Sequence, residues 1–255
     1  MGVSIFVKLF RFWGFASKKF LVAFFLEFLW LGYVGFCVLL TTVVRTKRVG
    51  PRPPNPCILA VTHVHGMEPP FVMRAVGRWR CWALYTVEWP NVLVRLLFRA
   101  FFRFEVTQNP SRKNKVNAET IKLAVRYLKN GGILMVFPEG HRFWERKLYP
   151  GVALLAKLAQ VPIVPVGVEN VPLYDPETSR LPVWRLFLRA LKQILHKRWV
   201  AVYFTPPIWP NPALSEDEDV DCLMQQIEYA FHRFYHQFYQ LPGPVWIKRR
   251  RLIIS

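Results

Sequence analysis

The chain has 255 residues, enough to bury one sizeable core, and hydrophobic residues make up 53% of it, which excludes an intrinsically disordered protein. Its formal net charge of +19 indicates an anionic partner. The basic residues are spread among apolar helical patterns, so we expect an anionic membrane surface and no nucleic acid. The four cysteines show no paired spacing, which indicates neither a disulfide framework nor a zinc site and fits a reducing cytosol.

The N-terminal segment has the pattern of a membrane-associated helix. Residues 3–19 mix large apolar with basic side chains, which is typical of a helix lying in a bilayer interface. Residues 20–44 are almost entirely apolar and exceed the ~20 residues that a spanning helix requires. One glutamate and two glycines in this run leave a spanning helix and a bent or re-entrant hairpin both open. We predict a membrane-associated helical segment over residues 1–48.

The rest of the chain has the pattern of one layered domain. A proline-rich stretch over residues 45–56 predicts a stiff, extended linker, to which we assign residues 49–56. Residues 57–255 alternate apolar runs of strand length with helical patterns, which predicts an α/β domain with a mostly parallel central sheet flanked by helices, and a basic tail. Strands are expected at 57–61, 82–87, 161–168, 199–204 and from 133, and helices at 91–102, 117–130, 150–159, 184–197 and from 215.

The first candidate site follows the strand at 57–61, where the chain reads Thr-His-Val-His-Gly-Met-Glu-Pro-Pro. His63 and Glu68 are five residues apart, so their side chains can meet across one turn. A histidine takes a proton from an alcohol at neutral pH when a carboxylate on its second ring nitrogen fixes the tautomer and stabilises the imidazolium. We predict that His63 is a general base and that Glu68 orients it, although such a pair also occurs in solvated turns.

Two further motifs follow the first in order. Residues 133–140 read Ile-Leu-Met-Val-Phe-Pro-Glu-Gly, and residues 161–168 read Val-Pro-Ile-Val-Pro-Val-Gly-Val. From about residue 57 to 170 the chain resembles the glycerolipid acyltransferases, the glycerol-3-phosphate and 1-acylglycerol-3-phosphate acyltransferases. That family carries His-x4-Asp, Phe-Pro-Glu-Gly-x-Arg and Val-Pro-Ile-x-Pro-Val in the same order. The resemblance makes the catalytic role of the histidine the favoured interpretation.

The resemblance also implies substrate contacts. Residues Phe137, Pro138, Glu139 and Gly140 would belong to the acceptor pocket, and Arg142 would reach a phosphate. From the residues alone, Pro-Glu-Gly is also typical of a tight strand-to-helix turn.

The chain departs from the family pattern at two positions. Glu68 stands where the family usually has Asp, one methylene shorter, and we expect the pairing with the histidine to survive. Gln108 stands where an arginine for the acceptor phosphate is expected, and Arg103, Arg112 or Lys113 would have to replace it.

A second histidine, His65, lies two residues after the first. Position 70 is proline, so His65 lacks an acid at the same spacing, and we expect it to support the site. His-Val-His-Gly is also similar to the His-Pro-His-Gly of diacylglycerol acyltransferase-like relatives, which makes His65 an alternative base. A metal pair of His63 and His65 lacks a third convincing ligand, so no metal is expected.

The resemblance to the glycerolipid acyltransferases implies a membrane-bound O-acyltransferase of phospholipid biosynthesis. We expect its catalytic domain to face the cytosol. It would move a fatty acyl group from acyl-CoA or acyl carrier protein to a hydroxyl of a lysophospholipid acceptor, 1-acylglycerol-3-phosphate, with no cofactor besides the acyl donor. One alternative keeps the fold and changes the acceptor to another lysolipid, a lipoamino acid or diacylglycerol. The other alternative is a non-catalytic basic membrane-binding protein.

Overall fold

The computed structural model describes residues 18–64, 67–77, 81–86, 103–106, 113–140, 145–171 and 183–246. Its main sheet contains β1 (Arg45–Val49), β2 (Cys57–Val61), β3 (Trp82–Thr86), β4 (Arg103–Val106), β5 (Ile133–Val136), β7 (Ile163–Glu169) and β8 (Trp199–Phe204). A small second sheet pairs β6 (Lys147–Leu148) with β9 (Val245–Trp246). The helices are α2 (Lys18–Val43), α3 (Glu68–Val76), α5 (Lys113–Lys129), α6 (Gly151–Ala159), α7 (Val183–Leu195) and α8 (Glu216–Phe234), which continues into the π-helical turn η3 (Tyr235–Tyr239).

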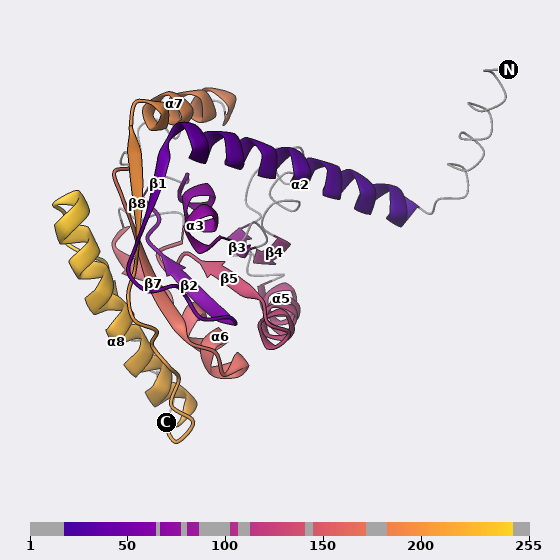
Figure 1. Cartoon of the computed structure of the whole chain (residues 1–255). Coiled ribbons are helices and arrows are strands. Elements are labelled where there is room, and N and C mark those ends of the chain that lie inside the picture. Colours follow the sequence, from indigo (N-terminus) through magenta and orange to yellow (C-terminus); the bar gives the residue numbers. More distant parts are fainter. Residues whose placement is uncertain are drawn as a thin grey trace, which may run out of the picture.

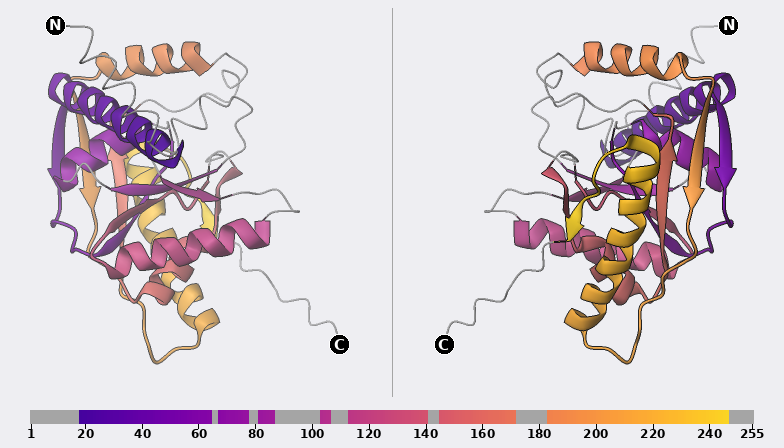
Figure 2. Two further views of the ribbon diagram at one scale, coloured as in Figure 1. Left: turned by 90° about the vertical axis from the view of Figure 1, so that its right-hand side faces the viewer. Right: turned by 90° about the vertical axis from the view of Figure 1, so that its left-hand side faces the viewer.

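The main sheet has the order β1-β8-β7-β2-β5-β3-β4. Strands β2, β5 and β7 are almost entirely buried, as expected for parallel strands with both faces covered. Figure 1 shows α8 on one side of this sheet and α2 and α3 on the other, and Figure 2 shows the same layers from two further directions. The prediction of an α/β domain with a mostly parallel sheet is confirmed.

Strands β1 and β8 are antiparallel to the other five strands of the main sheet. Strand β8 pairs with β7 in antiparallel fashion, and β1 pairs with β8 in parallel fashion. The amino ends of β1 and β8 therefore lie at the same edge of the sheet as the carboxyl ends of β2, β5 and β7. The side-chain amide of Asn170, just after β7, donates to the main-chain oxygen of Trp199 at the start of β8 over 2.6 Å and closes this edge.

The proline-rich linker is shorter than the stretch over residues 45–56 that we predicted from the sequence. Residues Arg45–Val49 form the edge strand β1 and pair along their whole length with β8. Their sequence, Arg-Thr-Lys-Arg-Val, lacks the apolar run that predicts a buried strand, because charged side chains are what an exposed edge strand carries. The sheet therefore begins before the linker.

Helix α2 has one buried and one exposed apolar face. Its second half packs against α3, with Cys37 and Leu40 buried in the core. On the opposite face Phe28, Leu31 and Leu39 are each at least 60% exposed. Within the part of the chain that the structure describes, no helix combines the length and apolar character needed to cross a membrane. Residues 3–19, expected to lie in the interface, fall largely outside that part.

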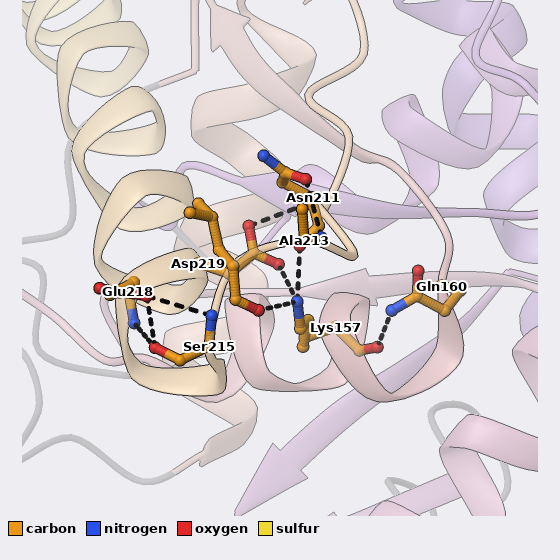
Figure 3. A network of polar contacts seen from close by, with 8 residues as sticks. Lys157, Gln160, Asn211, Ala213, Ser215, Glu218 and Asp219 are labelled. Atoms are coloured by element: carbon orange, nitrogen blue, oxygen red, sulfur yellow. Dashed lines mark hydrogen bonds and ion pairs between the residues drawn. The ribbon is translucent and has the colours of Figure 1, made fainter.

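The long C-terminal helix α8 begins where the sequence predicts, and a capping box closes its first turn. The Ser215 side chain accepts from the Glu218 main-chain N–H, and the Glu218 carboxylate accepts from the Ser215 N–H. Beside this turn, Lys157 of α6 extends its ammonium to the buried carboxylate of Asp219, 3.1 Å away, and donates to the main-chain oxygens of Asn211 and Leu214 (Figure 3). This ion pair joins α6 to α8.

We predict that Lys157→Met lowers the free energy of unfolding by about 3–5 kcal/mol, because it leaves the buried Asp219 carboxylate without its cation. The matched control is Lys147→Met, which removes a lysine from the half-exposed pair with Glu145 and should cost under about 1 kcal/mol. Denaturant unfolding of the three proteins measures both values. Equal losses in the two variants would contradict the structural role of the buried pair.

Candidate active site

His63 stands where the chain leaves the sheet. The Thr62 N–H still donates to Val166 of β7, so the ladder of β2 continues one residue beyond the strand. The next side chain, that of His63, is 24% exposed, whereas its Nδ1 atom is buried. A buried strand therefore delivers the imidazole to the edge of the sheet, with its Nδ1 atom turned into the protein.

Glu68 is the first residue of α3 and is fully buried. Its Oε2 atom lies 3.6 Å from His63 Nδ1, an ion-pair contact longer than a hydrogen bond, and its Oε1 atom accepts from the Val64 N–H over 2.8 Å. Pro69 and Pro70 follow, and proline is well suited to the first helical turn because it brings no N–H that needs a partner. The structure thus brings together the histidine and the carboxylate that we predicted to meet.

Glu139 follows β5, the strand next to β2, and is 1% exposed. Its Oε2 atom accepts from the His63 main-chain N–H over 2.9 Å, and its Oε1 atom accepts from the hydroxyl of Tyr235. Both oxygens therefore contact protein groups behind the imidazole. These contacts hold the main chain of the candidate base, and the predicted place of Glu139 in the acceptor pocket stays a prediction.

The other residues of the second motif form a tight turn beside the histidine. The Gly140 N–H donates to the Phe137 main-chain oxygen over 2.9 Å, and Gly140 has a φ of +67°, which favours glycine. Pro138 is buried, and its oxygen accepts from the Tyr149 N–H. The Phe137 ring lies 4.4 Å from the His63 ring, centroid to centroid, and forms one wall of the site.

Several residues singled out from the sequence lie outside the described part of the chain. These are His65, Gln108, Arg112 and Arg142, together with the basic helix expected over residues 91–102. Their predicted roles stay predictions.

Two tyrosines of η3 belong to the site, and sequence reasoning missed them. The hydroxyl of Tyr235 donates to Glu139, and that of Tyr239 donates to the Val168 oxygen over 2.6 Å and lies 3.3 Å from Thr62 Oγ1. The available signal was the spacing of four residues between the tyrosines in an aromatic-rich helix, which places both on one face. Nothing in the sequence shows that this face meets the ends of β2 and β5.

The buried carboxylates set the charge of the site. Burial lowers the pKa of His63, but the carboxylates of Glu68 and Glu139 outweigh it and hold that pKa above its ordinary value. Burial raises the pKa of Glu139 to about 7, although Tyr235 and the His63 N–H both stabilise its ionised form. The two buried carboxylates therefore favour the imidazolium form of His63.

Residues 42–169, about half of the chain, match the sequence profile of the family described as Acyltransferase. The chain belongs to the acyltransferase family. This confirms the family predicted from the motifs, and the match includes the histidine, both carboxylates and the turn at Phe137. The η3 tyrosines lie beyond it.

The crystal structure of the 1-acyl-sn-glycerophosphate (LPA) acyltransferase PlsC from Thermotoga maritima is similar to this protein, with 19% sequence identity and a TM-score of 0.45, over 87% of this chain and 84% of that chain. No curated protein matches the chain.

We predict that Glu68→Gln lowers kcat by about 1,000- to 10,000-fold, because the amide cannot stabilise the imidazolium as the carboxylate does. The lost negative charge also lowers the pKa of His63. Since the base must be neutral, the acid limb of the kcat/KM profile should move to lower pH. Glu228→Gln, in the exposed pair of Glu228 with His232, is the matched control. An acid limb that stays in place or moves to higher pH would contradict the pairing.

Proposed function

We propose that this acyltransferase moves a fatty acyl group from acyl-CoA or acyl carrier protein to a hydroxyl of 1-acylglycerol-3-phosphate, in phospholipid biosynthesis. The observation that carries the proposal is the pairing of His63 with the buried Glu68 at the carboxyl end of β2, in a chain of the acyltransferase family. A lysophospholipid acceptor also suits a basic protein, because its phosphate is anionic.

In the proposed reaction His63 removes the proton of the acceptor hydroxyl as its oxygen attacks the thioester carbonyl. Nε2 is the atom that takes the proton, because Nδ1 is buried beside Glu68. The tetrahedral intermediate then breaks its carbon–sulfur bond, and the departing thiolate receives the proton back from the imidazolium. The acyl group passes directly to the acceptor, so the reaction needs no acyl-enzyme.

The main-chain N–H groups nearest the base are engaged elsewhere. The N–H of His63 donates to Glu139 and that of Val64 donates to Glu68. Neither is therefore free to stabilise the oxyanion of the intermediate. We propose that the oxyanion is stabilised by donors on the open side of the imidazole, where the thioester carbonyl has to lie.

The first test measures release of free thiol from acyl-CoA by the purified protein in detergent. We expect release that requires 1-acylglycerol-3-phosphate and exceeds that with glycerol-3-phosphate or an uncharged acceptor. His63→Ala should lower it by about 100- to 10,000-fold, the usual contribution of a general base. His232→Ala is the matched control, because His232 belongs to an exposed His–Glu pair on α8 and should leave the rate unchanged.

The acyl donor is settled by the same assay. If acyl-CoA supports no release, acyl carrier protein replaces it as donor. Release that requires a different acceptor would replace 1-acylglycerol-3-phosphate as the proposed substrate and would leave the proposed acyl transfer unchanged. Absence of release with both donors and every acceptor would overturn the enzymatic proposal in favour of a non-catalytic membrane-binding protein.

We also propose that the edge of the sheet carrying His63 faces an anionic membrane surface, with the catalytic domain on the cytosolic side. The exposed apolar face of α2 suits the bilayer, and the free cysteines fit a reducing compartment. Helix α7 contains no acidic residue, and its exposed side chains combine arginine and lysine with leucine. Figures 1 and 2 show α7 and α2 at the same end of the molecule.

The test of this orientation is binding to vesicles that contain anionic phospholipid. Replacing Arg185, Arg189 and Lys192 of α7 with glutamine should weaken binding by about 100-fold, since each basic residue near such a surface contributes about 1 kcal/mol. Replacing Lys122, Arg126 and Lys129 of α5 removes the same charge from exposed positions toward the other end of the molecule (Figure 1) and should weaken binding much less. Equal losses in both triple variants would contradict the proposed orientation.

A further inference from the structure

We propose that Tyr235 is a positioning residue for the reaction, which holds His63 in place through Glu139. The inference rests on the proposed function, in which His63 is the base. The Tyr235 hydroxyl donates to one oxygen of the Glu139 carboxylate, and the His63 N–H donates to the other. Tyr235 and Glu139 are each 1% exposed, so neither hydrogen bond competes with water.

The position that this contact controls is the first turn after β2. Two successive main-chain N–H groups, those of His63 and Val64, each donate to a different buried carboxylate. Glu68 comes from the following helix, whereas Glu139 comes from the turn after the neighbouring strand β5. The turn is therefore held by two carboxylates that come from different parts of the chain. Tyr235 orients one of them, that of Glu139.

The contact also supports the charge of the base. Among the described residues, the titratable groups that act on Glu139 are His63, Glu68, Tyr235 and, through the same cluster, Tyr239. Burial and the negative charge of Glu68 favour the neutral form of Glu139, and the Tyr235 hydroxyl favours the ionised form. Without that hydroxyl Glu139 takes up a proton more readily, and its charge no longer raises the pKa of His63.

The tyrosine reaches the site because the C-terminal helix lies directly on β7. A Cβ atom on Gly167 would lie 2.6 Å from the Phe234 ring and 2.8 Å from the Phe238 ring, so only glycine permits this approach. The π-helical turn that follows places Tyr235 and Tyr239 at the ends of the strands, where π-helical turns often serve functional sites. This element lies outside residues 42–169, so the family profile does not include it.

The experiment compares Tyr235→Phe with the wild type in detergent. We expect kcat to fall by about 10- to 100-fold with both KM values unchanged, because a base displaced by a fraction of an ångström still allows the substrates to bind. Titration of the His63 ring by NMR should give a lower pKa in the variant. Tyr203→Phe is the matched control, since Tyr203 donates to Glu169 over 2.7 Å in another tyrosine–glutamate pair. It should change neither kcat nor the pKa of His63.

Glu139→Gln separates positioning from a general loss of structure. Alone it should lower the pKa of His63, and in its presence Tyr235→Phe should lower that pKa no further, because the tyrosine acts through the carboxylate. An unchanged His63 pKa in Tyr235→Phe, or an equal fall in both backgrounds, would overturn the inference. The NMR readout needs no turnover, so it tests the contact even if the wild type releases no thiol and the proposed function fails.

Discussion

Two carboxylates buried side by side against one turn of chain are the main physical constraint on this structure. Glu68 and Glu139 are both almost completely inaccessible to water, and their mutual repulsion disfavours the ionised forms. Hydrogen bonds from two main-chain amides and one tyrosine hydroxyl, together with the imidazole, offset that cost. Four elements, β2, α3, β5 and η3, meet at this point to supply these contacts, so the site and the fold depend on each other.

The direction of two strands connects this site with the membrane-facing surface that we propose. If β8 and β1 ran parallel to the other five strands, α7 and the end of α2 would lie at the opposite edge from His63. Their reversed direction brings both helices to the edge where the turn that carries His63 emerges. A lipid acceptor held at a membrane surface would then meet the base without leaving the bilayer interface.

Two regions of the chain supply residues to the site. Residues 42–169, which match the acyltransferase family, supply the imidazole and both carboxylates. The C-terminal helix supplies the tyrosines that fix one of those carboxylates, and it is itself attached to the domain by the Lys157–Asp219 pair and by its close approach to β7 at Gly167. The second region thus stabilises the geometry of chemical groups that the first region provides.

The sequence by itself determined the features that depend on local spacing. Continuous apolar runs identified β2, β5 and β7, and the five-residue separation of His63 and Glu68 identified a pair that one turn of chain can close.

Tertiary structure alone decided the features that depend on strand neighbours. Glu139 reaches the His63 amide because β5 lies beside β2, and Tyr235 reaches Glu139 across 96 residues of chain. The strand β1 is formed by pairing with β8, since its own charged sequence carries no apolar pattern. Short-range contacts leave a periodicity in the sequence, whereas contacts between distant segments depend on the order of the strands, which no local pattern encodes.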